Sequence, residues 1–399
     1  MPELSGYLRK DGRKGIRNIV IVAYLVECAH HVAREITLPL REDGVHLIGF
    51  PGCYPNAYAH RMMENISTHP NVGAVLLVSL GCESFARQQL ADSIAASGRP
   101  VETLVIQEHG GTRNTIKEGR AWVEKVRGQL EQQQRVPMGI DELVIGTICG
   151  GSDATSGLTA NPAIGHAFDN LVEQGAACIF EETGELIGCE QHLARRAVTP
   201  ELGAEVVASI DKARECYDTL GHGSFANGNA EGELTTQEEK SMGAYAKSGF
   251  GALHGLIKPG DVPPRGGLYL LDVVPDGEVR FGFPNIVDNA EIGELIACGC
   301  HLILFSTGRG SVVGSAVSPV IKICGNPQTF ENLSDDMDLN AGAILTDNIT
   351  LPEVGDQLLE LVYQTVAGAA TRSESLCHQE FILTYKSFEP LGPGCLPGF

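Results

Sequence analysis

The chain has 399 residues, 43% of them hydrophobic, which is more than one ordinary hydrophobic core accommodates, so a globular protein of two domains is expected. Its 29 Lys and Arg residues against 50 Asp and Glu residues give a formal net charge of −21, which argues against nucleic acid or an anionic membrane as partner. The first residues form no apolar signal core, and no apolar run is long enough to span a bilayer. We therefore expect a cytoplasmic protein whose 12 cysteines serve metal binding or catalysis rather than disulfides.

The first domain is expected over residues 1–135, because strand and helix patterns alternate there and end in a polar run. Strands are expected at residues 18–25 and 100–106, with helices at 57–67 and 112–129. Gly111 and Thr112 form a strand-to-helix turn whose free backbone N–H groups make a candidate anion site. No dinucleotide-binding or P-loop fingerprint appears.

Three short apolar runs, in both halves of the chain, end in cysteine beside glycine. They cover residues 46–53, 74–82 and 143–149. Such runs are typical of strands buried in parallel sheets, and ligands of open α/β sheets lie outside the carboxyl ends of the strands. Cys53, Cys82 and Cys149 are therefore candidate ligands of a metal, with iron as the expected metal. The alternative is that each thiol packs as a small hydrophobe.

The second domain is expected over residues 136–399 and begins with the Cys149 strand. Small polar residues follow it, and Ser152, Asp153 and Asn161 are candidate substrate-binding residues. The next strand, residues 176–180, ends before Glu182, a candidate metal ligand or proton acceptor. An acid favoured by a helix dipole is an equally good reading of Glu182.

A long loop after residue 222 runs into a helix that Thr235 is expected to cap, with Glu238 completing a capping box. Lys240 then lies near the start of this helix, where the dipole disfavours a cation. We therefore regard Lys240 as a candidate to hold a carboxylate or accept a proton.

The best anion-binding turn of the chain is expected after the strand at residues 301–306. Thr307, Arg309 and Ser311 offer hydroxyls and a guanidinium that can hold a carboxylate or sulfonate bidentately. Further strands are expected at residues 267–274, 321–324 and 343–346. The fold class is thus α/β, with two Rossmann-like domains of parallel or mostly parallel sheets and flanking helices.

Thiols, carboxylates, lysines and glycine-rich anion sites suit a metal-assisted β-elimination from a small anionic 2-hydroxy acid. A base, Lys240 or Glu182, removes the C2 proton, iron stabilises the enediolate, and the C3 substituent leaves. Three thiolates would suit an iron–sulfur cluster, whereas a single ferrous ion prefers oxygen and nitrogen ligands, so the form of iron stays open.

Several long motifs resemble the altronate/galactarate dehydratase family. They are residues 6–18, 81–83, 149–153, 159–162, 235–241 and 307–311. Residues 23–31, 50–56 and 381–386 are most similar to the large subunit of its sulfolactate sulfo-lyase branch. Residues 50 and 51 depart from the dehydratase branch, which leaves the role of that turn open.

The resemblance implies an iron-dependent lyase that eliminates sulfite from (2R)-3-sulfolactate to give pyruvate. It also implies a separate small (α) subunit, because the dehydratases carry a small domain before the motif with which this chain begins. We expect an oligomer. The alternatives are a dehydratase of altronate or a related sugar acid, giving a 2-keto-3-deoxy acid, and a non-catalytic cofactor-binding or scaffold protein.

Overall fold

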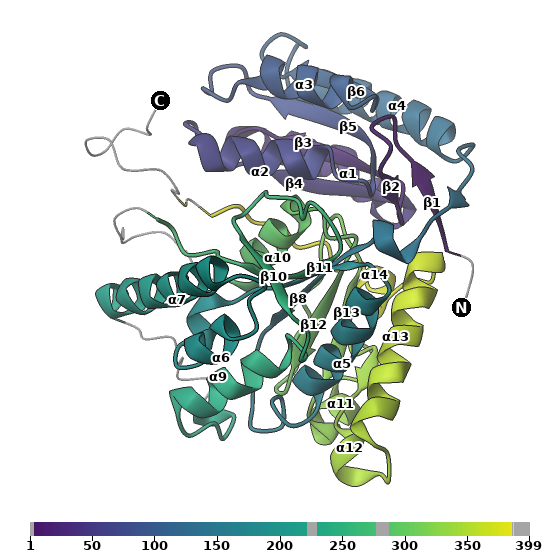
Figure 1. Cartoon of the computed structure of the whole chain (residues 1–399). Helices are drawn as coiled ribbons and strands as arrows, with labels where there is room; N and C mark the ends of the chain where they lie inside the picture. The colour runs from purple at the N-terminus through teal and green to yellow at the C-terminus, as the bar shows by residue number, and fades with distance from the viewer. Residues whose placement is uncertain (1–3, 222–229, 277–286, 385, 387–399) are drawn as a thin grey trace.

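The computed structural model describes residues 4–221, 230–276, 287–384 and 386. Two parallel sheets form the framework, each flanked by helices, and the four-stranded sheet lies above the larger, seven-stranded one in Figure 1. The predicted α/β class with two parallel-sheet domains is confirmed. No helix of the described ranges is both long and apolar enough to cross a membrane.

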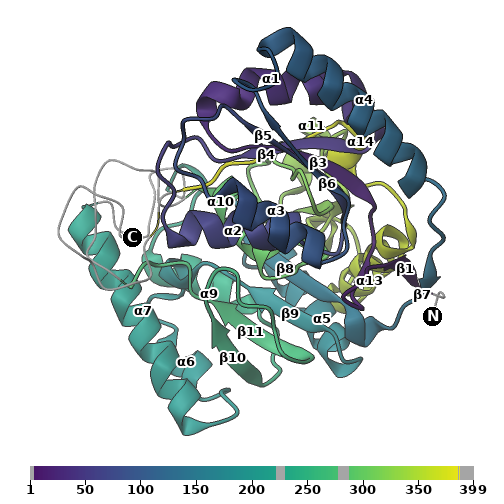
Figure 2. The same ribbon diagram turned by 90° about the horizontal axis from the view of Figure 1, so that it is seen from above.

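The four-stranded sheet has the order β4-β3-β5-β6, and all of its strands are parallel. Its strands are β3 (Ile19–Tyr24), β4 (Val45–Gly49), β5 (Val72–Ser79) and β6 (Val101–Val105). Helices α1 and α4 cover one face and α2 and α3 the other, as the view from above in Figure 2 shows. They are α1 (Glu27–Thr37), α2 (Ala57–Ser67), α3 (Arg87–Ala96) and α4 (Thr112–Leu130).

The seven-stranded sheet has the order β10-β11-β9-β8-β12-β13-β14 and is also parallel throughout. Its strands are β8 (Val144–Cys149), β9 (Ala177–Phe180), β10 (Leu253–Ile257), β11 (Gly267–Leu271), β12 (Leu302–Thr307), β13 (Val320–Cys324) and β14 (Leu339–Asn340). The helices around it are α5 (Ala160–Glu173), α6 (Glu190–Ala194), α7 (Pro200–Leu220), α9 (Gln237–Ala246), α10 (Asp288–Ala297), α11 (Pro327–Asn332), α12 (Ala343–Thr346), α13 (Leu351–Ala367) and α14 (Arg372–Ser375).

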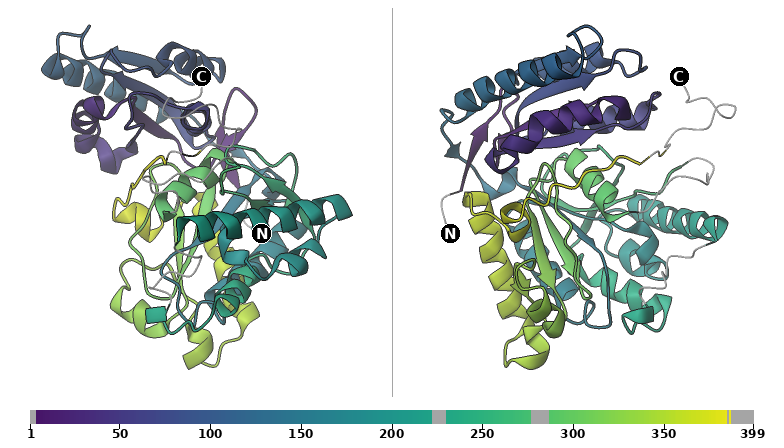
Figure 3. Two further views of the ribbon diagram at one scale, coloured as in Figure 1. Left: turned by 90° about the vertical axis from the view of Figure 1, so that its left-hand side faces the viewer. Right: turned by 180° about the vertical axis from the view of Figure 1, so that it is seen from behind.

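Alternating side chains of the strands build the cores. On β12, Leu302 and Leu304 pack toward α5 and α13, whereas Ile303 and Phe305 pack toward α10. The α10 side is continuous with residues of α2 and β3 from the other domain. One hydrophobic cluster therefore spans both domains and packs α2 against α10. Figure 3 shows the two domains stacked in both views.

A small antiparallel sheet connects the domains, in the order β2-β1-β7. It comprises β1 (Ser5–Leu8), β2 (Lys14–Gly15) and β7 (Val136–Pro137). The boundary that we expected at residue 135 falls directly before β7, so the chain passes between the domains beside its own first strand.

Two local predictions were wrong. Residues 343–346 form the short helix α12 rather than a strand. The N-cap of α9 is Thr236, whose hydroxyl accepts from the backbone N–H of Glu239, and the Glu239 carboxylate accepts from Thr235. The capping interaction exists, but one residue later than the sequence pattern had suggested, because Thr235 and Thr236 are equally good caps.

Candidate active site

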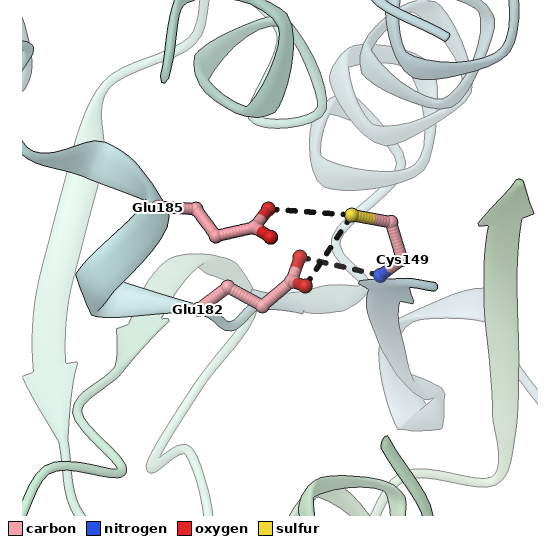
Figure 4. A group of neighbouring side chains, drawn as sticks. All are labelled: Cys149, Glu182 and Glu185. Carbon is pink, nitrogen blue, oxygen red and sulfur yellow. Dashed lines mark hydrogen bonds between the residues drawn. The ribbon is translucent and has the colours of Figure 1, made fainter. Parts of the chain in front are cut away.

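Three potential metal ligands converge where β8 and β9 end. Cys149 is the last residue of β8, while Glu182 and Glu185 follow β9, its neighbour in the sheet. Parallel strands deliver such residues to the same edge, so the side chains point toward one another in Figure 4. The ligand atoms of all three lie within 4.8 Å of one another, and no other set of three or more is this compact among the described residues.

Hydrogen bonds fix this group. The Cys149 sulfur lies 3.3 Å from both Glu182 Oε1 and Glu185 Oε2, so its single S–H proton has an acceptor in either carboxylate. The backbone N–H of Cys149 donates to Glu182 Oε2 at 3.2 Å. The hydroxyl of Ser152 lies 3.3 Å from the same sulfur. The carboxylates are therefore held by the end of β8 itself.

Two buried lysines from the α9 region neutralise the carboxylates. Lys247 caps the carboxyl end of α9 and forms an ion pair with Glu182. Lys240, on the same helix, pairs with Glu185, and its Nζ lies 3.4 Å from the Ser152 hydroxyl. Both lysines are buried, so these pairs are shielded from solvent.

The environment separates the protonation behaviour of the two carboxylates. Burial and the neighbouring Glu185 carboxylate raise the pKa of Glu182 to about 7, although Lys247 and Lys240 oppose this rise. Burial also favours the neutral form of Glu185, but Lys240 and Lys247 outweigh it and lower the pKa of Glu185. One acid is thus able to exchange a proton near neutral pH while the other stays ionised.

The cationic and thiol partners keep their protons in this arrangement. Burial alone would lower the pKa of Lys240, but its contact with Glu185 raises it above the ordinary value. Burial and the two carboxylates raise the pKa of the Cys149 thiol well above its ordinary value. Lys240 therefore acts as a cation here, and Cys149 as a hydrogen-bond donor.

The backbone at Glu182 adopts a conformation that residues with a side chain seldom take. Its φ of 80° lies in the left-handed region, and among described residues other than glycine only Glu233 and Cys377 share a positive φ. Such strain is retained where the surrounding structure holds a residue in place, and it clusters at functional sites. The turn directs the Glu182 carboxylate to the end of β8.

A cavity of about 440 Å³ opens beside this group. Cys149, Glu185 and Lys240 form part of its wall. The rest of the lining mixes small polar residues with apolar ones, namely Ser152, Asp153, Ala154, Ser156, Gly157, Leu158, Asn161, Leu234, Glu239, Met242, Gly243 and Ala244. The cavity is large enough for a small organic acid, and the ion pair of Lys240 with Glu185 lies in its wall.

All three residues predicted from the turn after β8 line the cavity, but they do so differently. Asp153 turns inward and accepts four hydrogen bonds from Thr155 and Ser156, so its carboxylate stabilises the loop. Asn161 donates to Gly243 O at 3.0 Å, while its Oδ1 is buried without a partner among the described residues. Ser152 contacts both Cys149 and Lys240.

The other predicted substrate-binding residues do not line this cavity. The Thr307 hydroxyl accepts a hydrogen bond from the backbone N–H of Gly310 and so closes its own turn. Arg309 forms an ion pair with Glu231 at 3.0 Å. Ser311 lies farther along the same loop. Gly111 and Thr112 begin α4 in the four-stranded domain.

The turn after β12 nevertheless supports the cavity wall. Backbone N–H groups of Gly308 and Arg309 donate to Gly151 O at 3.1 and 2.8 Å. A Cβ at Gly308 would lie 1.9 Å from Asp153 Oδ1, so glycine is required for this close approach. This turn therefore positions the loop after β8 rather than facing the cavity.

The predicted three-thiol centre is not formed in this structure. Cys53 and Cys82 are exposed and follow β4 and β5 of the four-stranded sheet, whereas Cys149 is buried in the seven-stranded one. The common pattern of the three strands correctly indicated thiols at strand ends, but it carried no information about which sheet each strand joins.

Lys247 was missed by sequence reasoning. A signal was present, because Lys247 follows Lys240 by seven residues and two helical turns bring such residues to one face. Glu185 was not singled out from the sequence either. The structure shows that these two residues complete the pairs that surround Cys149.

Comparison with known proteins agrees with the motifs. The C-terminal domain of D-galactarate/altronate dehydratase matches residues 140–388, and the second domain of D-galactarate dehydratase/altronate hydrolase matches residues 6–131. The chain belongs to the D-galactarate/altronate dehydratase family. The family predicted from the sequence is thereby confirmed.

Within this family, several characterised relatives are similar over most of the chain. The β subunit of (2R)-sulfolactate sulfo-lyase from Chromohalobacter salexigens is 34% identical, over 95% of this chain and 96% of that subunit. Galactarate dehydratase (L-threo-forming) of Escherichia coli is 32% identical, over 91% of this chain and 72% of the relative. Altronate dehydratase of Bacillus subtilis is 27% identical, over 93% of this chain and 75% of the relative. All three relatives are lyases by name, which supports a lyase as the class of this chain.

Proposed function

We propose that this chain is the large subunit of a lyase that eliminates sulfite from (2R)-3-sulfolactate and yields pyruvate. The observation that carries the proposal is the Glu182 carboxylate, held between Lys247 and the Cys149 thiol. Glu182 does not itself line the cavity, but it contacts Cys149, which does. A carboxylate whose pKa is about 7 is suited to accept a proton near neutral pH. The proposed proton acceptor is therefore Glu182.

Lys240 is the proposed cation for the substrate carboxylate. It lines the cavity, and the overall charge of −21 makes a local cation necessary for an anionic ligand. Asn161 Oδ1 is a suitable acceptor for the 2-hydroxyl proton, because it is buried at the cavity and has no partner among the described residues. Ser152 also lines the cavity, and its hydroxyl contacts both Cys149 and Lys240.

The reaction then proceeds by loss of two groups from neighbouring carbons. Glu182 takes the C2 proton, the electron pair of the C2–H bond forms the C2–C3 double bond, and the C3–S bond breaks with its electrons leaving on sulfite. The resulting enol of pyruvate gains a proton at C3 and loses the proton of its 2-hydroxyl to solvent, which gives pyruvate. The ammonium of Lys240 stays beside the carboxylate throughout and stabilises the negative charge that develops on it.

The family resemblance implies iron, and the group of Cys149, Glu182 and Glu185 offers ligands for it. One thiol and two carboxylates within 4.8 Å of one another fit a single divalent ion in type and proximity, although Lys240 and Lys247 now neutralise the carboxylates. Cys149, Glu182 and Glu185 would hold such an ion, and a bound metal would supply Lewis-acid stabilisation of the enediolate. Glu182 would then be one of the metal ligands, and Lys240 would keep its role as the cation for the substrate carboxylate.

Similarity to a protein named as a β subunit supports a separate small (α) subunit as partner. Dehydration of a sugar acid is the alternative reaction, supported by the similarity to galactarate and altronate dehydratases. The apolar residues of the cavity favour sulfolactate, because hydroxyls of a longer sugar acid would face Leu158, Leu234 and Met242 without partners.

The test is an anaerobic assay with the small subunit present, in which sulfite and pyruvate are measured with sulfolactate and 2-keto acid is measured with altronate or galactarate. We expect equal amounts of sulfite and pyruvate and little product from the sugar acids. Turnover of the sugar acids without turnover of sulfolactate would favour the dehydratase instead. Iron content measured on the same samples tests the metal separately.

A further inference from the structure

The exposed cysteines of the described residues all lie at one edge of the four-stranded sheet. They are Cys28, Cys53 and Cys82, while the other described cysteines are buried or half-buried. Cysteine is among the residues most often buried, so three exposed thiols in one place have no explanation in packing.

Strand register places the ends of the three strands that precede the cysteines level with one another. Tyr24 of β3 pairs with Gly49 of β4 on one side and with Val78 of β5 on the other. Each cysteine follows the paired residue of its own strand by four positions. Three adjacent parallel strands, in the order β4-β3-β5, thus bring a thiol to the same carboxyl edge.

Backbone hydrogen bonds join the segments that carry these thiols, with Cys28 in the first turn of α1 and the other two cysteines in loops. Glu27 N, next to Cys28, donates to Pro51 O at 3.1 Å. Ser84 N donates to Cys53 O at 2.9 Å, which ties the loop after β5 to the loop after β4. The loops that follow all three strands are therefore linked to one another.

The Cys82 loop is held from within by Glu83. Its carboxylate accepts the backbone N–H of Gly81 at 2.8 Å and the hydroxyl of Ser79. This carboxylate is turned back toward the strand, so the loop presents the exposed Cys82 in a fixed backbone.

We propose that Cys28, Cys53 and Cys82 bind a thiolate-ligated metal centre at this edge, as a single soft or borderline ion or as an iron–sulfur cluster. Thiolates select such metals, and three of them leave a coordination position open. The three sulfur atoms are less tightly gathered than the ligands around Cys149. Binding of a single ion therefore requires rotation of the exposed side chains toward one another, whereas a cluster holds its thiolates farther apart than an ion does.

This centre is independent of the site at Cys149. The two sets share no residue and belong to different sheets. They also differ in chemistry, because one offers only thiols, whereas the other combines a buried thiol with carboxylates and lysines.

The test uses the reduced full-length chain under anaerobic conditions. One arm adds Co²⁺ alone, and the other adds Fe²⁺ with sulfide. Thiolate-to-metal charge-transfer absorption and metal retained after gel filtration are measured in both arms. The variants are Cys28→Ser, Cys53→Ser and Cys82→Ser, with Cys216→Ser on α7 as a matched control and Cys149→Ser as a control for the other site.

We expect charge-transfer absorption that each of the three variants lowers at least tenfold and that both control variants retain. Absorption with Co²⁺ assigns a single ion, and absorption only with Fe²⁺ and sulfide assigns a cluster. The proposal is overturned if neither arm gives absorption, if any one of the three thiols proves dispensable, or if Cys149→Ser alone abolishes the signal. Circular dichroism of every variant excludes unfolding, which is not expected at exposed positions.

Discussion

Two glutamates at the carboxyl ends of the two parallel sheets are held in opposite ways. Glu83 follows β5 and accepts hydrogen bonds from Ser79 and Gly81. Burial alone would raise its pKa, but these bonds lower the pKa of Glu83 below the ordinary value. Glu182 follows β9, where burial and a neighbouring carboxylate raise its pKa to about 7.

The difference shows that topological position supplies a site but not its chemistry. Neutral donors directed at Glu83 keep it ionised and make it part of the loop structure. Glu182 instead shares its surroundings with Glu185, a thiol and two ammonium groups, so its proton is exchangeable. Among the described residues, only the group around Glu182 contacts a cavity whose wall also contains a buried cation, Lys240.

The substitution Glu182→Gln is expected to have the largest effect on catalysis. Glutamine keeps the shape of the side chain but accepts no C2 proton, so kcat for sulfite release should fall by about 10²–10⁴. The measurement is steady-state kinetics with the small subunit present, and Glu201→Gln at an exposed position on α7 is the matched control. Activity of Glu182→Gln within twofold of the control would show that another residue accepts the proton.

Lys240→Met should have the next largest effect. Loss of the cation that holds the substrate carboxylate costs about 1.5–3 kcal/mol, so kcat/KM should fall roughly 10- to 100-fold, mainly through KM. The exposed Lys125→Met on α4 serves as control. A lower kcat with unchanged KM would instead indicate that Lys240 takes part in proton transfer.

The residues that these predictions test could be recognised from the sequence to different degrees. Buried apolar runs predicted the strands that end at Cys149 and before Glu182, because burial on both faces leaves a clear pattern. The partners of those residues come from distant segments. The spacing of Lys240 and Lys247 indicates a shared helix face, but the local sequence does not show that Lys247 reaches Glu182. The sequence also could not show that Cys53 and Cys82 belong to a different sheet from Cys149, since pairing between strands is set by long-range packing.

Substitution of Asn161 should have a smaller effect. Asn161→Ala removes the Oδ1 acceptor proposed for the 2-hydroxyl, so kcat/KM should fall by roughly tenfold, equivalent to about 1.4 kcal/mol. The check is to measure the affinity of the variant for the 2-hydroxy substrate and, by competitive inhibition, for the 2-deoxy analogue. If Asn161 binds the hydroxyl, the variant should lose affinity for the substrate but keep its affinity for the analogue, and equal losses for both would contradict that role.

The smallest effect should come from Glu83→Gln and should appear in stability. Loss of charge-assisted hydrogen bonds to Gly81 and Ser79 should lower the free energy of unfolding by about 1–2 kcal/mol at neutral pH. Because the pKa of Glu83 is lowered in the fold, its contribution is present above the ordinary pKa and is lost as pH falls through the folded value. Urea unfolding at neutral and acidic pH should therefore show a difference between variant and wild type that shrinks on acidification. A difference that stays constant would mean that the ionised form is not what the loop requires.

The most direct test of the proposed role of Glu182 is the pH dependence of kcat/KM for sulfite release. A base must be deprotonated to act, so kcat/KM of the wild type should rise with pH and level off with a break near pH 7, where the Glu182 carboxylate loses its proton. The residual activity of Glu182→Gln should lack this break. A wild-type profile without a break near pH 7, or a variant that keeps the same break, would contradict the assignment of Glu182 as the proton acceptor.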